Sequence, residues 1–244
     1  MLASLAVAGF LFTASPQATN PNSYLFHMQT GADGKVHLVG KRYQPQSGDL
    51  ILFDDHNPVT AKIYSCCGTG RPLHAGIIFL KDDGSPAVLE AGTNAVMKVF
   101  VFDFHSRLKN FDGTILIRQL RTPLSVEREK ALRDFAWGQE GKGYALGRAI
   151  LHASPFRARE PVYTAPFGRT VLDRDRWICS ELAVAAATSA GILNPATHPA
   201  NLMLPRDLCY DERYDLSKMY ESPALWSPRA KLDEVDGGVR VGPR

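Results

Sequence analysis

Short apolar runs, each bounded by residues that favour turns, dominate the first half of the chain. Six such runs share this pattern, at 36–39, 50–53, 73–80, 87–91, 96–102 and 114–120. Short runs at this spacing are typical of strands in an antiparallel sheet or a small barrel. The turn sequence at 81–86, with two Asp residues and a Gly, predicts a hairpin between the third and fourth runs. Residues 58–72 are rich in Pro, Ser, Cys and Gly, and we expect an irregular excursion there.

The second half of the chain changes to helical periodicity. Ser125 is a favourable N-cap residue for a helix over 126–139, whose Ala, Leu and Phe side chains form an apolar face. A second helix is predicted over 179–190, with Gly191 at the position that often ends a helix. A last short element is expected to begin at Pro205. A sheet of short strands packed against helices makes the fold class α+β.

The N-terminal residues 1–18 contain an apolar stretch followed by small and polar residues. The stretch is too short to cross a bilayer as a helix. It is similar to the apolar region of a secretory signal, although no Lys or Arg precedes it. We expect export to a periplasmic or extracellular compartment; a buried N-terminal element in a cytoplasmic protein is the alternative. Residues 19–44 are expected to be a polar connector, apart from the apolar run at 36–39.

Composition and charge narrow the classes of function. The chain has 244 residues, of which 45% are hydrophobic and 22% are charged, and this suits one large globular domain. The formal net charge is only +3 and no block of Lys or Arg stands out, so nucleic-acid binding is not expected. No His and Cys cluster has the spacing of a zinc site. We expect neither a metal nor a cofactor.

Cys179 and His74 are the best candidates for chemistry. Cys179 begins the second predicted helix, where the helix dipole and free backbone N–H groups stabilise a thiolate. His74 lies at the entry of the run 73–80, and a histidine close to a thiol can take its proton and later protonate a leaving group. Glu90 is on the partner strand of the predicted hairpin, where it can lie beside His74 and orient the imidazole.

Each of these residues also has an ordinary structural interpretation. A cysteine at a helix start is often a small buried apolar side chain, a histidine in an apolar strand is often a satisfied core residue, and Glu90 on an edge strand would face water. The other cysteines, Cys66, Cys67 and Cys209, form no CxxC pair, and we expect them in loop or packing positions. In an oxidising compartment, the alternative is a disulfide from Cys209 to Cys66 or Cys67.

Several short motifs together resemble a known family. They are GDLILF at Gly48–Phe53, HAGII at His74–Ile78, VLEA at Val88–Ala91, GKGY at Gly141–Tyr144 and ICSEL at Ile178–Leu182. In their order, with the histidine strand before the cysteine helix, the chain is similar to the circularly permuted branch of the NlpC/P60 papain-like cysteine peptidases, the YaeF/YiiX type. The resemblance implies a permuted papain-like domain over 45–210, with an insertion at 153–176 and a C-terminal extension at 211–244.

The resemblance also implies a thiol hydrolase or an acyltransferase. Carried over to this chain, Cys179 is the nucleophile, His74 the general base and Glu90 the residue that orients His74. The backbone N–H of Cys179 is then one oxyanion donor. Tyr144 matches an aromatic residue that lines the substrate pocket. Trp177 stands where we expect a tyrosine in the family pattern.

The substrates that the resemblance implies are peptide-like amides, cell-wall peptides or acylated lipids, which suggests proximity to the cell envelope or a membrane. Our main hypothesis is hydrolysis of a peptide-like amide or an acyl ester through a covalent acyl-enzyme. The alternatives are a binding protein that keeps the fold without the chemistry, a lipid acyltransferase, and a redox protein that uses Cys66 and Cys67.

Overall fold

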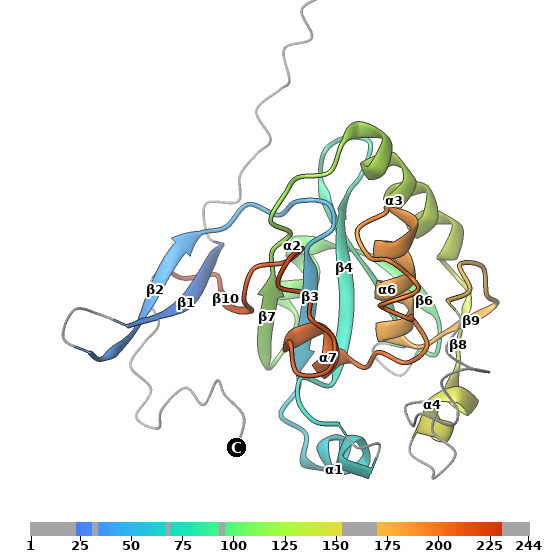
Figure 1. The fold of residues 1–244 in the computed structure, drawn as a ribbon, viewed down its shortest axis with the longest axis horizontal. Coiled ribbons are helices and arrows are strands. Elements are labelled where there is room, and N and C mark those ends of the chain that lie inside the picture. The colour runs from blue at the N-terminus through green and yellow to red at the C-terminus, as the bar shows by residue number, and fades with distance from the viewer. Residues whose placement is uncertain (1–22, 31–33, 67–68, 93–95, 153–169, 231–244) are drawn as a thin grey trace, which may run out of the picture.

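The structure, a computed structural model, describes residues 23–30, 34–66, 69–92, 96–152 and 170–230, and a large sheet forms its centre (Figure 1). The strands of this sheet are β1 (Tyr24–Thr30), β2 (Val36–Arg42), β3 (Leu50–Asp54), β4 (His74–Leu80), β5 (Pro86–Ala91), β6 (Val99–Asp103), β7 (Thr114–Arg118) and β10 (Ala224–Ser227).

The eight strands follow the spatial order β2-β1-β10-β7-β3-β4-β5-β6. Every neighbouring pair is antiparallel. The sheet is open, since β2 and β6 form its two edges. The expected α+β class with an antiparallel sheet is therefore confirmed, in the open form and not as a closed barrel.

The helices are α1 (Pro58–Cys66), α2 (Phe104–Lys109), α3 (Val126–Gln139), α4 (Leu146–His152), α6 (Cys179–Ser189) and α7 (Pro205–Cys209). Residues of α3, α6 and α7 pack on one face of the sheet and residues of α2 on the other. A short parallel pair, β8 (Gly143–Tyr144) with β9 (Arg176–Trp177), lies just before α4 and α6 in the chain. The excursion expected at 58–72 contains the helix α1. The side-chain oxygen of Asn57 accepts the backbone N–H of Val59 in the first turn, and the helix is nine residues long.

The two long helices agree with the sequence pattern. The helix α3 has the predicted bounds, and the Ser125 hydroxyl accepts the backbone N–H of Arg128 as an N-cap. The helix α6 begins at Cys179, as predicted, and Gly191 follows its end with a φ of 67°. This left-handed conformation favours glycine. The start of α6, where the candidate nucleophile lies, was thus predictable from local sequence.

The core has two parts, one on each face of the sheet. Side chains of β3, β4 and β5 alternate between them: Leu52, Ile77 and Leu89 pack toward α3 and α6, whereas Phe53 and Ile78 pack toward α2. The helix α6 is buried around its whole circumference from Cys179 to Ala187. Its small alanine side chains let it lie close against the sheet, which brings its N-terminus next to the start of β4.

Within the expected polar connector at 19–44, the apolar run at 36–39 is part of β2, as predicted, whereas β1 was not predicted; the two strands form an antiparallel hairpin within the sheet. Most of this hairpin is exposed, so burial does not impose a regular apolar alternation on its sequence. The residues 211–244, expected to be an extension, contribute β10, which lies between β1 and β7. β1 pairs with β10, which is far away in the sequence, and the residues next to each strand give no signal that predicts this pairing.

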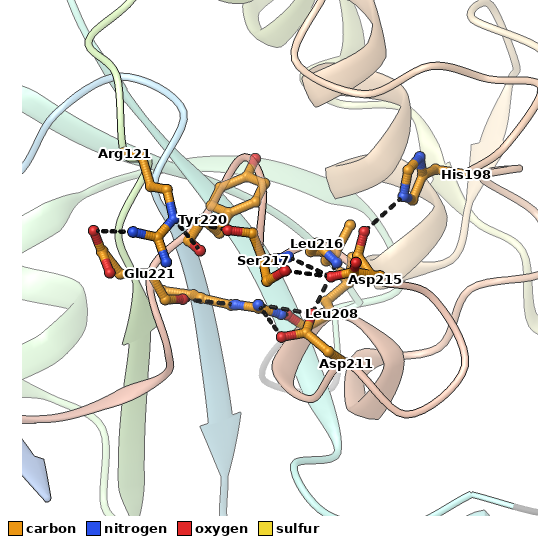
Figure 2. A network of polar contacts seen from close by, with 10 residues as sticks. Arg121, His198, Leu208, Asp211, Asp215, Leu216, Ser217, Tyr220 and Glu221 are labelled. Carbon is orange, nitrogen blue, oxygen red and sulfur yellow. Dashed lines mark hydrogen bonds and ion pairs between the residues drawn. The ribbon is translucent and has the colours of Figure 1, made fainter.

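Buried polar contacts attach the C-terminal residues to β7. The guanidinium of Arg118, the last residue of β7, is buried and donates to both carboxylate oxygens of Asp211 at 2.8 and 2.7 Å. It also donates to the backbone carbonyls of Leu208 and Glu221. Close by, Arg121 forms an ion pair with Glu221 (Figure 2). These contacts hold the chain from 208 to 221 on the path that leads into β10.

The Gly-Asp motif before β3 has a structural role. Asp49 is fully buried, and its carboxylate accepts hydrogen bonds from the Tyr43 hydroxyl and from the backbone N–H groups of Gln46 and Leu120. Burial raises the pKa of Asp49 to about 6, although the three hydrogen bonds act in the opposite direction. Asp49 therefore joins the chain before β3 to the residues that follow β7.

Candidate active site

The hairpin of β4 and β5 places His74 and Glu90 side by side. His74 is the first residue of β4, and the antiparallel register pairs Glu90 of β5 with Gly76. His74 and Gly76 are two positions apart, so their side-chain directions share one face of the sheet. The Nε2 atom of His74 lies 2.8 Å from Oε2 of Glu90. The Glu90 side chain is completely buried, whereas 20% of the His74 side chain is exposed. The imidazole therefore lies between the buried carboxylate and the protein surface.

Glu90 has a second partner, Arg107, which the sequence did not reveal. Arg107 Nε donates to Glu90 Oε1 at 2.8 Å, and Arg107 Nη2 donates to Oε2 at 3.0 Å. Arg107 lies on α2, which begins at the N-cap Asp103, whose carboxylate accepts the backbone N–H of Ser106. The Asp-x-x-Ser spacing is a signal for the helix start, but nothing local indicates that the arginine reaches Glu90 across β6.

Cys179 is the first residue of α6 and is only 1% exposed. His74 and the backbone N–H groups of Ala75 and Ser180 act on its sulfur and lower the pKa of the thiol. Ala75 belongs to β4 and Ser180 to α6, so the sulfur lies where the two elements meet. Because Glu90 occupies Nε2 of His74, Nδ1 is the ring nitrogen left for the thiol.

The electrostatics of this pair favour the ionised forms. Burial alone would raise the pKa of Cys179, but the charge and hydrogen bond of His74 and the two backbone N–H groups lower it below its ordinary value. Burial alone would lower the pKa of His74, but the Cys179 thiolate and the hydrogen bond and charge of Glu90 raise it. Each group therefore stabilises the charge of the other, and a thiolate beside an imidazolium is the favoured state.

Glu90 stays ionised for a similar reason. Burial would raise the pKa of its carboxyl, but hydrogen bonds and charge from His74, and then from Arg107, lower it below its ordinary value. An ionised carboxylate only accepts hydrogen bonds. It therefore requires the proton of His74 to be on Nε2 whenever the ring is neutral, which leaves the Nδ1 lone pair directed toward Cys179.

Gly76 provides the space that Glu90 needs. A Cβ atom on this glycine would lie 2.8 Å from Cγ of Glu90 and 2.9 Å from the backbone oxygen of Leu89, well inside ordinary contact distance. We expect Gly76→Ala to push Glu90 away from His74, to destabilise the protein by about 1–3 kcal/mol and to slow alkylation of Cys179.

Thermal unfolding and mass spectrometry of the alkylated protein measure both effects of Gly76→Ala. The matched control is Gly138→Ala in α3, where a Cβ atom meets nothing within 4 Å and helix propensity favours alanine. The control should melt no lower than the wild type and keep its Cys179 reactivity. An unchanged melting temperature in Gly76→Ala would contradict the steric explanation.

Three apolar residues surround Cys179, and an ion-pair cluster supports them. Ala145 and Ile178 pack against Cys179, together with Ala149 of α4. Glu181, two residues after Cys179, is directed toward arginines: Arg148 of α4 at 2.7 Å and Arg174 at 3.0 Å. A Glu181 side chain that faced the thiol would raise its pKa, but these contacts show that its charge is compensated elsewhere.

The remaining candidate residues have clear positions but untested roles. Tyr144 lies in β8, and its ring packs on Gly92, so that a Cβ atom on this glycine would overlap the ring. Gly92 is two residues beyond Glu90 in the chain, so Tyr144 lies near the site, and its contact with substrate stays a prediction. Trp177 is fully buried and donates its indole N–H to Gln139 at 3.0 Å.

Some expectations concern residues that the structure does not describe. Cys67 and the side chain of Cys66 lie outside the described residues, and so does most of the expected insertion at 153–176. Cys209 is buried and is a free thiol. Across the described ranges, no three His, Cys, Asp or Glu side chains are grouped so that they could hold a metal ion. No helix in the described part of the chain is long and apolar enough to span a membrane.

The chain is similar in structure to a known protein. No family model and no curated protein matches the chain. Among solved structures, the chain matches the crystal structure of the metalloprotein yiiX from Escherichia coli O157:H7, DUF1105, with probability 1.00. The match covers 61% of this chain and 67% of that chain, with 21% sequence identity and a TM-score of 0.42.

Proposed function

We propose that the protein is a thiol-dependent acyl hydrolase, in which Cys179 is the nucleophile, His74 the general acid and base, and Glu90 the residue that orients His74. The observations that carry this proposal are the hydrogen bond between His74 and Glu90 and the effect of His74 on Cys179 at the N-terminus of α6, where it lowers the pKa of the thiol. A thiolate, an imidazolium and a carboxylate are costly to bury. Their alignment around one partly exposed ring is what nucleophilic catalysis requires.

The first half of the reaction forms an acyl-enzyme. The Cys179 thiolate attacks the carbonyl carbon of an amide or ester, and a C–S bond forms while the carbonyl oxygen takes up the negative charge. The backbone N–H of Cys179, at the N-terminus of α6, is the proposed oxyanion donor. His74 gives its Nδ1 proton to the leaving amine or alcohol as the bond to the leaving group breaks. Cys179 then carries the acyl group and His74 is neutral.

The second half releases the acyl group to water. Nδ1 of His74 takes a proton from water, and the resulting hydroxide oxygen attacks the thioester carbonyl. The C–S bond breaks, its electron pair returns to sulfur, and a carboxylic acid leaves. The thiolate and the imidazolium are thereby restored. The proposed substrates are peptide-like amides, cell-wall peptides or acyl esters of lipids, and an alcohol or amine in place of water would make the protein an acyltransferase.

The test of the proposed function is the pH dependence of iodoacetamide alkylation at Cys179, read by mass spectrometry. We expect wild-type Cys179 to react rapidly well below pH 8.5, the pKa of an ordinary thiol, because its pKa is lowered by His74. In His74→Ala the lowering is lost, and the rate at pH 6 should fall by up to about tenfold for each unit by which the pKa rises above 6.

Cys209 supplies an internal control in the same sample. It is buried, and burial raises the pKa of its thiol to about 12, so it should stay unmodified over the whole range. If Cys179 reacted like an ordinary thiol in both wild type and His74→Ala, the ion pair would be absent. The hydrolase proposal would then be abandoned in favour of a binding protein.

A further inference from the structure

The Glu90 carboxylate faces two cations, of which only one keeps its charge throughout the proposed reaction. His74 is an imidazolium in the resting state but neutral in the acyl-enzyme, because it has given its proton to the leaving group. Arg107 takes no part in the proton transfers of the reaction and keeps its charge, because an arginine guanidinium is not deprotonated in proteins. It binds both oxygens of Glu90, through Nε and Nη2. A buried carboxylate without a nearby cation takes up a proton.

We propose that Arg107 is a positioning residue that keeps Glu90 ionised while His74 is neutral, so that His74 remains the base that activates water on the acyl-enzyme. This inference rests on the proposed function. Without Arg107, the pair of Glu90 and neutral His74 would hold one extra proton. If that proton were on Nδ1, it would occupy the lone pair that has to take a proton from water. If it were on Glu90, the carboxylic acid would donate a hydrogen bond to Nε2, and the neutral ring would carry its proton on Nδ1, which is the wrong tautomer.

The surroundings of Arg107 fit this role. Its guanidinium carbon lies 4.4 Å from the ring centroid of Phe53 and 5.2 Å from that of Phe111. These rings stabilise the cation and contribute no titratable group. The Phe53 ring also packs against the imidazole of His74, with 5.7 Å between the ring centroids. The arginine and the histidine are thus fixed against one aromatic ring while both bind the same carboxylate.

The charged groups that face Glu90 come from three elements. His74 reaches it from β4 and Arg107 from α2, and Cys179 of α6 acts on it through His74. On β6 the residue paired with Glu90 is Phe100, which carries no charge. The planar guanidinium matches the two carboxylate oxygens at once, which an ammonium cannot do.

The experiment uses the full chain alkylated at Cys179 with iodoacetamide. The thioether imitates the acyl-enzyme because it carries no charge, so His74 titrates beside Glu90 and Arg107 alone. The titration of His74 is followed by NMR, and its signal is assigned by its absence in His74→Ala. We expect Arg107→Met to move the midpoint to higher pH by one unit or more, and Arg107→Lys to stay closer to the wild type.

Two further variants keep the test decisive. Arg107→Gln retains an N–H donor without the charge, and it should show the same shift if Arg107→Met does not fold. Lys109→Met removes an exposed cation from the same helix and should leave the midpoint unchanged. A His74 midpoint that is the same in the wild type and in a folded neutral variant would overturn the role of Arg107.

A kinetic measurement separates this inference from the proposed function. With p-nitrophenyl acetate, the neutral variants should keep the initial burst of nitrophenolate but lose tenfold or more in steady-state rate at pH 7, with recovery at higher pH. If the wild type does not turn over the ester, the hydrolase proposal loses its support, whereas the NMR titration still decides whether Arg107 controls the proton on His74. A burst that falls together with the steady-state rate would contradict a role in deacylation.

Discussion

Cys179→Ala is expected to abolish turnover while leaving the fold intact. The methyl side chain keeps the packing with Ala145 and Ile178 but provides no nucleophile, and loss of a nucleophile typically costs about 10⁴–10⁶ in kcat. Cys179→Ser is expected to lose nearly as much, because a serine hydroxyl does not form the ion pair with His74 that lowers the pKa of the thiol. Steady-state hydrolysis of p-nitrophenyl acetate measures the loss.

The control for the nucleophile is Cys209→Ala. This thiol is buried in the main core, whereas Cys179 belongs to a separate apolar cluster, so the variant should melt earlier but keep its activity per folded molecule. Circular dichroism of both alanine variants would show that the fold is retained. A fully active Cys179→Ala would contradict the whole catalytic scheme.

Glu90→Gln is expected to have the largest combined effect on stability and activity. The amide is nearly isosteric but leaves the guanidinium of Arg107 buried without a counter-charge. Removal of one partner of a buried ion pair costs about 3–5 kcal/mol. An amide that donates to Nε2 also holds His74 in the wrong tautomer, a defect worth roughly 10⁴ in kcat in a comparable triad. Urea unfolding at pH 7 and ester hydrolysis measure the two losses.

The pH dependence and a double variant check the cause of the loss in Glu90→Gln. Since the pKa of Glu90 is lowered in the folded state, its ionisation stabilises the protein above the ordinary pKa of about 4.3. This stabilisation is lost as the pH falls through the lowered folded pKa, so the difference in the free energy of unfolding between wild type and variant should narrow in acid.

The double variant Glu90→Gln, Arg107→Met should recover stability relative to Glu90→Gln. If it is less stable still, the uncompensated arginine is not the cause.

Local sequence signals predicted the parts of the fold that local physics determines. Ser125 and Gly191 satisfy the ends of helices through their own backbone and side-chain geometry, so the start of α3 and the end of α6 follow from a few residues. The β4–β5 hairpin follows from its turn. By contrast, the pairing of β1 with β10 joins residues some 200 positions apart, and no local preference encodes a partner at that distance.

The residues of the candidate site also differ in whether local sequence or long-range packing determines their positions. Cys179, His74 and Glu90 were predictable, because a helix start and a hairpin place them and the order of the motifs carries a resemblance. Arg107 was not, because its ion pair with Glu90 spans β6 and depends on how α2 folds back on the sheet. The burial of Cys179 was equally hidden, since it depends on packing with Ala145 and Ala149.

The position of β10 has a consequence for synthesis of the protein in the cell. The β1–β2 hairpin pairs with the rest of the sheet only through β10, so its backbone has no further strand to pair with until residue 227 has been translated. At about 5–20 residues per second, the hairpin waits roughly 10–40 s after its own synthesis. During that time the edges of β1 and β7 are unpaired and open to mispairing.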